Sequence, residues 1–168
     1  MVLILNCVHE FLKQNILHHK SKERKVRAMP KTIVQEVVFK NANVKDLYDL
    51  YMNAKKHSAT TGAQAKIAAR EGSSYSVHDG YIKGKNLRLV KDKLIVQTWR
   101  ASDWSPDDYD STFIISLEQE GKNAVLRAIH ANVPDKHANG IDKGWHEYYW
   151  EPWKKYLAGK PVSKSGKM

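Results

Sequence analysis

The chain has 168 residues, 42% hydrophobic and 27% charged, which is typical of one soluble globular domain and too short for two. A single cysteine, Cys7, excludes an intrachain disulfide and favours a reducing compartment, so we expect a cytoplasmic protein. No apolar run approaches the ~18 residues of a membrane helix, so no membrane span is expected.

The net charge of +10 is concentrated at the two ends of the chain. Residues 1–30 carry six Lys or Arg against two Glu, and residues 154–168 carry five lysines and no acidic residue. The middle, 31–153, holds 17 basic and 16 acidic residues, a net charge of +1. A nucleic-acid-binding domain should carry its charge on a folded face. We therefore expect no specific nucleic-acid partner.

Residues 1–29 form an N-terminal extension that is weakly amphipathic and basic. Its apolar stretch precedes the basic run 20–27, the reverse of the order in a signal peptide. Two interpretations stay open: a short interfacial or partner-docking helix, or a disordered segment upstream of the true start at Met29. We expect a domain over 30–158, followed by a basic disordered tail over 159–168.

The domain begins with a β-rich run and two short helices. Residues 32–39 predict a strand. Asn43 can cap a helix whose buried stripe is Val44, Leu47, Tyr48 and Tyr51, at i, i+3, i+4 and i+7. A second short helix is expected over 54–61, ended by Gly62 in a left-handed conformation.

Several strands follow in quick succession, over 65–70, 73–78, 93–100, 111–120 and 123–132. Asp79-Gly80 predicts a type I′ hairpin turn, and Gly84 in the next run predicts a β-bulge. Alternation around Phe113 and Ile115 indicates strands with one buried and one solvent-facing side.

The last element is a long helix rich in aromatic residues. Ile141, Trp145, Tyr148 and Tyr149 recur at helical spacing, and Pro152 predicts a kink or break. A sheet with one apolar face must be covered, and this helix is the only long element available. We therefore predict an α+β fold in which a curved antiparallel sheet of about six to seven strands wraps around the C-terminal helix.

Six short runs resemble the C-terminal domain of the activator of heat-shock protein 90 ATPase. They are GSSYSVHDG at 72–80, IKGKNL at 82–87, IVQTWR at 95–100, Asp103-Trp104, Gly144-Trp145 and YYWEP at 148–152. The resemblance extends from about 31 to 157. It implies the START-like, helix-grip (SRPBCC) superfamily, with a cavity between sheet and helix. The eukaryotic co-chaperones of this family also carry a separate N-terminal domain, for which this chain has no room.

The expected cavity gives seven candidate ligand-binding residues: Trp99, Phe113, Ile115, Leu126, His130, Trp145 and Tyr149. Indole suits an oily ligand held in one orientation, and the alternative is that each tryptophan simply fills the core beneath the helix. His130 should face the helix, because Arg127 on the same strand should point to water. It is either a polar anchor or proton acceptor in the cavity, or a histidine bonded to backbone near its strand end.

Catalytic and metal-binding patterns find little support. Ser73, Ser74 and Ser76 lie near His78, but no nucleophile elbow accompanies them. The acidic loop 103–110 lacks the calcium-loop spacing and is expected to be solvated, and no histidine pair has zinc-ligand spacing. No phosphate-binding glycine loop follows a strand. We expect no catalytic residues, no metal and no cofactor.

Three hypotheses for function remain. The first is a non-catalytic binding protein whose cavity holds a small apolar or amphipathic molecule. The second, which rests on the resemblance, is a chaperone cofactor that stimulates a heat-shock protein 90-type ATPase. The third is a cyclase- or hydrolase-like enzyme, which would need a second polar group converging with His130.

Overall fold

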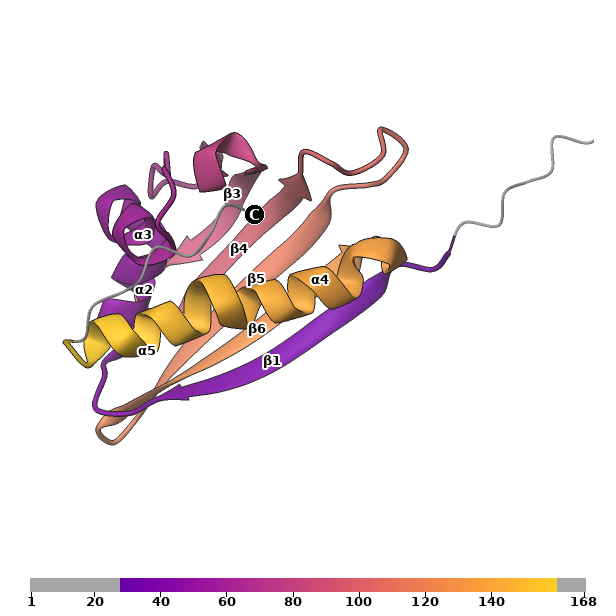
Figure 1. Ribbon diagram of the computed structural model, residues 1–168. Coiled ribbons are helices and arrows are strands. Elements are labelled where there is room, and N and C mark those ends of the chain that lie inside the picture. The colour runs from indigo at the N-terminus through magenta and orange to yellow at the C-terminus, as the bar shows by residue number, and fades with distance from the viewer. Residues whose placement is uncertain (1–27, 160–168) are drawn as a thin grey trace, which may run out of the picture.

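The computed structural model describes residues 28–159 (Figure 1). The predicted extension and tail fall largely on residues 1–27 and 160–168, outside the described residues, and so remain predictions. The elements in chain order are β1 (Lys31–Phe39), α2 (Val44–Met52), α3 (Ala54–Thr61), β2 (Ser74–Val77), the 3-10 turn η1 (His78–Gly80), β3 (Ile82–Val90), β4 (Leu94–Ala101), β5 (Ser111–Glu120), β6 (Asn123–Val133), α4 (Asp135–Trp145), the π-helical turn η2 (His146–Trp150) and α5 (Glu151–Leu157).

Six antiparallel strands form one sheet in the order β1-β6-β5-β4-β3-β2. Figure 1 shows α4, η2 and α5 running as one long helix across a face of the curved sheet, with α2 and α3 beside its C-terminal end. Trp145 and Tyr149 are each only 3% exposed, so the apolar stripe of this long helix faces the sheet. The predicted α+β helix-grip fold is confirmed, with six strands.

Each of the two short helices begins directly after an asparagine that caps it. The Asn43 side chain accepts a hydrogen bond from the backbone of Asp46, and Asn53 caps α3 in the same way. Gly62 ends α3 in the left-handed conformation, with φ 76°. Leu47 and Tyr51 on the predicted stripe are buried, which places α2 against the core.

Gln35 of the edge strand β1 binds the long helix through hydrogen bonds. Its amide nitrogen donates to both the backbone and side-chain oxygens of Asp142, at 2.9 and 2.7 Å. Its amide oxygen accepts from Nε1 of Trp150 at 2.5 Å. One buried polar side chain therefore holds α4 and η2 at fixed positions along β1.

The irregularity predicted at Pro152 is present as the π turn η2. Proline has no backbone N–H, so the carbonyl four residues earlier, on Tyr148, loses its α-helical donor. The preceding N–H, on Glu151, bonds to the carbonyl of His146, five residues back. The helix accommodates the missing hydrogen bond in one π turn and continues as α5.

Two local predictions in the strand region were wrong. Residues 65–70 form no strand and contribute a single bridge between Lys66 and Ser76, because the Asn86 side chain binds the carbonyls of Ala68 and Arg70 instead. The β-bulge in β3 lies between Asn86 and Arg88, not at Gly84.

The loop between β2 and β3 has four residues, 78–81, where a two-residue hairpin turn was predicted. Asp79 and Gly80 do adopt positive φ, at 57° and 94°, but His78 does so as well, at 52°. The wider loop turns His78 inward and carries Tyr81 to the mouth of the pocket described below. Within residues 28–159 no helix is long and apolar enough to cross a membrane.

Candidate functional site

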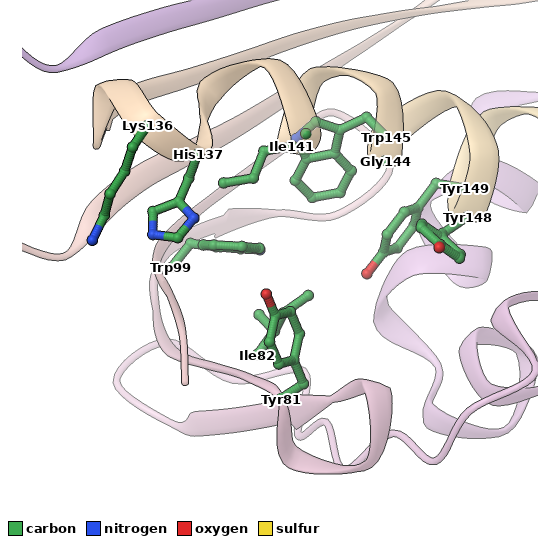
Figure 2. A pocket seen from close by; sticks show the side chains of 11 residues that line it. Tyr81, Ile82, Trp99, Lys136, His137, Ile141, Gly144, Trp145, Tyr148 and Tyr149 are labelled. Atoms are coloured by element: carbon green, nitrogen blue, oxygen red, sulfur yellow. The ribbon is translucent and has the colours of Figure 1, made fainter. Parts of the chain in front are cut away.

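A pocket of about 360 Å³ lies between α4 and the β3 end of the sheet (Figure 2). Eleven residues line it: Tyr81, Ile82, Trp99, Lys136, His137, Gly140, Ile141, Gly144, Trp145, Tyr148 and Tyr149. Six of the eleven carry aromatic side chains, with His137 counted among them. The wall is therefore mainly aromatic, and its polar groups are phenols, an imidazole and the Lys136 ammonium.

One stripe of the long helix forms one wall of the pocket. Its lining positions recur every three or four residues from His137 to Tyr149, which is the spacing of one helical face. Gly140 and Gly144 stand in this stripe and leave room that a side chain would occupy. A Cβ added at Gly140 would meet no atom within 4 Å. The sequence therefore keeps the pocket open at that position.

The sheet and the β2–β3 loop form the opposite wall. Trp99 of β4 is 4% exposed, and its ring contacts that of Trp145, with centroids 6.4 Å apart. Figure 2 shows the Tyr81 hydroxyl pointing from the loop toward the helix. That hydroxyl donates to Asp103 at 3.0 Å, and burial, followed by this hydrogen bond, raises the pKa of Tyr81 to about 12. Tyr81 is thus protonated at neutral pH.

His137 provides a polar group at the mouth. Its ring stacks on Trp104, with centroids 5.8 Å apart, and its Nδ1 lies 4.0 Å from Oδ2 of Asp103. Its Nε2 is buried and has no hydrogen-bond partner among the described residues. A buried imidazole nitrogen without a partner can bind a polar group that enters the pocket.

His130 stands behind the pocket wall, not in it. Trp145 Nε1 donates to His130 Nδ1 at 3.2 Å, so the proton of the neutral ring is on Nε2, which lies 2.7 Å from Ser111 Oγ. Ser111 in turn donates to the carbonyl of Trp99 at 2.8 Å. Burial lowers the pKa of His130 to about 3. Both nitrogens are in use within the core, which leaves none for a ligand or a reacting proton.

Three other candidate residues also lie outside the pocket lining. Phe113 is fully buried and stacks on Trp145, with centroids 3.9 Å apart and planes 6° from parallel. Ile115 and Leu126 are buried farther along the interface between sheet and helix. Phe113 and His130 thus hold Trp145 in place, while Trp99, Trp145 and Tyr149 are the candidates that reach the pocket.

Tyr149 connects the pocket to a pair of buried histidines. Its hydroxyl lies 3.0 Å from His78 Nε2, and burial raises the pKa of the phenol far above its ordinary value. His57 Nδ1 faces the carbonyl of Tyr51 at 2.9 Å, so its Nε2 is unprotonated, and that atom has no partner among the described residues. Burial lowers the pKa of both histidines to about 4. This cluster is neutral at pH 7.

No group of three or more histidine, cysteine or acidic side chains that could hold a metal gathers within 28–159. The acidic loop 103–110 is organised by Arg100, which donates to the carbonyls of Ser105 and Asp108 at 2.7 Å. Arg100 also pairs with Asp110 at 3.2 Å. The loop is thus folded around a cation that the chain itself supplies.

Sequence reasoning missed several lining residues for identifiable reasons. Ile141 and Tyr148 were on the predicted helical stripe, Gly144 falls within it, and extending the stripe by one turn toward the N-terminus reaches His137. Tyr81 belongs to a loop whose length was misjudged, and no periodic signal places a loop residue against a helix.

The fold defines a protein of the helix-grip class. Residues 41–158 match the protein family described as "Activator of Hsp90 ATPase homolog 1-like protein". The chain therefore belongs to this family.

Curated relatives and solved structures agree with this assignment. An "Activator of 90 kDa heat shock protein ATPase homolog" from Dictyostelium discoideum is 30% identical over 101 residues, 60% of this chain and 26% of that protein. The human "Activator of 90 kDa heat shock protein ATPase homolog 1" is 26% identical over 145 residues, 79% of this chain and 43% of that one. The chain thus spans less than half the length of these relatives.

Two solved structures show the same fold. An HSP90 activator from Plasmodium falciparum superimposes with a TM-score of 0.66 at 21% identity, over 80% of this chain and 99% of that chain. CalU16 from Micromonospora echinospora gives a TM-score of 0.67 at 18% identity, over 79% and 77% of the two chains.

Proposed function

We propose that this chain is a non-catalytic START-like binding protein whose pocket between α4 and β3–β4 holds a small amphipathic aromatic molecule. The observation that carries the proposal is the open space of about 360 Å³ walled by Trp99, Trp145 and Tyr148. Pockets for small ligands have volumes from about 300 Å³ upward and combine apolar walls with a few polar groups. This pocket is at the small end of that range.

The chemistry of the walls supports a flat ligand with a polar edge. Indole and phenol faces favour stacking with another ring. His137 Nε2, buried without a partner among the described residues, and the hydroxyl of Tyr81 could bind a polar substituent at the mouth. Gly140 gives the ligand space against the helix backbone.

The polar groups at the pocket favour binding over catalysis. His130, the residue nominated as a proton acceptor, has both nitrogens occupied in the core. Tyr81 and Tyr149 have raised pKa values and therefore keep their protons at pH 7, as donors of hydrogen bonds. The family, too, is named for activating an ATPase and not for a reaction of its own.

Native mass spectrometry of the purified full chain tests the proposal. We expect a co-purifying small molecule, or, for the empty protein, a ligand-dependent rise in Tm when a panel of aromatic acids and phenols is screened. The absence of both a bound mass and any stabilising compound would reject the ligand-binding function.

Chaperone cofactor activity is a second candidate, which the names of the relatives favour specifically. We propose that the domain binds a heat-shock protein 90-type chaperone in the cytoplasm and raises its ATPase rate. The test is ATP turnover by the cognate chaperone with and without the full chain. An unchanged rate together with no complex in sedimentation would reject this candidate.

A further inference from the structure

Apart from the aromatic pocket, a groove lies on the face of the sheet opposite the helix, over β2, β3 and β4. Side chains alternate between faces along a strand. Ile82 and Trp99 point to the helix side, so Lys83, Lys85, Thr98 and Arg100 point to the other. The groove has a volume of about 650 Å³ and lies away from the aromatic pocket.

The strand register aligns cations and hydroxyls in two rows across this face. Arg100 stands opposite Lys83, Lys83 opposite Ser76, and Ser76 opposite Lys66. One step along, Lys85 stands opposite Ser74. Since neighbouring strands are about 4.8 Å apart, the first row extends for about 14 Å. The result is a band of positive charge that crosses four chain segments.

The floor of the groove is an interruption in the β3–β4 ladder. The Lys85 N–H donates to the side-chain oxygen of Thr98 at 2.9 Å, and the Tyr75 hydroxyl donates to the Thr98 carbonyl, also at 2.9 Å. A Cβ on Gly84 would collide with that carbonyl and with the Tyr75 ring. Tyr75 can lie there because residue 84 has no side chain.

The three lysines of the groove are not neutralised by the domain itself. Lys66, Lys83 and Lys85 are exposed and form no ion pair with any residue from 28 to 159. Arg100, by contrast, is paired with Asp110, which also lines the groove, and is held by the 103–110 loop. Like charges directly opposite each other on a sheet are destabilising. This clustering occurs in a body, 31–153, whose net charge is only +1.

We propose that this groove is the docking site for an acidic segment of a partner protein, lying across the strands. The rows are too long for one small anion to contact every lysine. Lysines act as point charges and suit flexible carboxylate chains, with the serine hydroxyls as additional donors. The lining shows no exposed aromatic ring on which bases could stack, which disfavours single-stranded nucleic acid.

A matched pair of triple variants of the full chain tests the proposal. The groove variant is K66Q/K83Q/K85Q. The control variant, K40Q/K91Q/K122Q, removes the same charge from exposed lysines in the turns after β1, β3 and β5. The probe is a fluorescein-labelled peptide of alternating glutamate and serine, followed by fluorescence anisotropy. Both variants keep the basic ends of the chain, so any binding there is common to both.

We expect the groove variant to lose at least about tenfold in affinity, because each exposed charge pair contributes a few-fold, and the control to lose less than about twofold. Equal losses in the two variants would show general charge attraction and overturn the proposal. Tighter, groove-dependent binding of a DNA duplex would overturn it in favour of nucleic acid. A G140L variant should keep peptide binding, which separates this surface from the ligand pocket.

Discussion

Trp145 donates its indole N–H to Nδ1 of His130, with 3.2 Å between the two nitrogens, and stacks face to face on Phe113. One ring of the pocket wall is thereby fixed both at its polar edge and on one face. The same histidine reaches the backbone of Trp99 through Ser111. Two tryptophans that line the pocket therefore depend on one buried imidazole.

Replacing His130 with alanine should destabilise the protein by about 3 kcal/mol, because it leaves a cavity and an unpaired indole N–H. Urea unfolding followed by tryptophan fluorescence measures the loss. H146A, at an exposed histidine of the long helix, is the control and should change stability by less than about 0.5 kcal/mol. Equal effects of the two substitutions would contradict the structural role of His130.

Three buried histidines should make the protein sensitive to mild acid. Burial lowers the pKa of His130 to about 3 and the pKa values of His57 and His78 to about 4. In the unfolded chain a histidine titrates at about pH 6.5. Below that pH the unfolded state binds more protons than the folded state. The stability from the neutral rings is complete above about pH 6.5 and falls as the pH drops toward 4.

Each histidine contributes up to about 1.4 kcal/mol per pH unit inside this window. Free energies of unfolding between about pH 7.5 and about pH 5 give the slope. H57Q should reduce the slope by up to about one proton. A flat profile in the parent protein would contradict neutral burial of these rings.

The fold could be predicted from local sequence patterns, which depend on residues close together in the chain. Asn43 capped α2 as predicted, and the alternation on β6 correctly set Arg127 outward and His130 inward. Such signals fix which face of an element is buried. They do not fix how deep a residue lies, so Phe113 and His130 were assigned to a cavity although they stand behind its wall.

The remaining parts of the site depend on contacts between distant segments. Tyr81 lines the pocket because the β2–β3 loop has four residues and three consecutive positive φ angles. The Gly84 prediction failed for a similar reason. Its lack of a side chain is required by Tyr75, nine residues earlier, and not by a bulge in its own strand.

Gly84→Ala should destabilise the protein by about 2–3 kcal/mol, since a Cβ there cannot avoid the backbone carbonyl of Thr98. Thermal unfolding and amide hydrogen exchange in β3 and β4 measure the effect. Gly140→Ala, where a Cβ meets nothing within 4 Å, is the control and should stabilise the helix by up to about 1 kcal/mol. Wild-type stability of G84A would show that Tyr75 does not occupy this place.

Filling the aromatic pocket from the helix side separates ligand binding from folding. Gly140→Leu places an apolar side chain at a pocket-lining position where a Cβ meets no atom within 4 Å, so stability should stay within about 1 kcal/mol of the parent or rise. Any ligand found by native mass spectrometry should be lost, and its stabilisation of Tm with it. Asn139→Leu adds the same side chain at an exposed neighbouring position outside the pocket lining and should retain the ligand. If G140L still binds as the parent does, the ligand lies elsewhere and the pocket assignment is wrong.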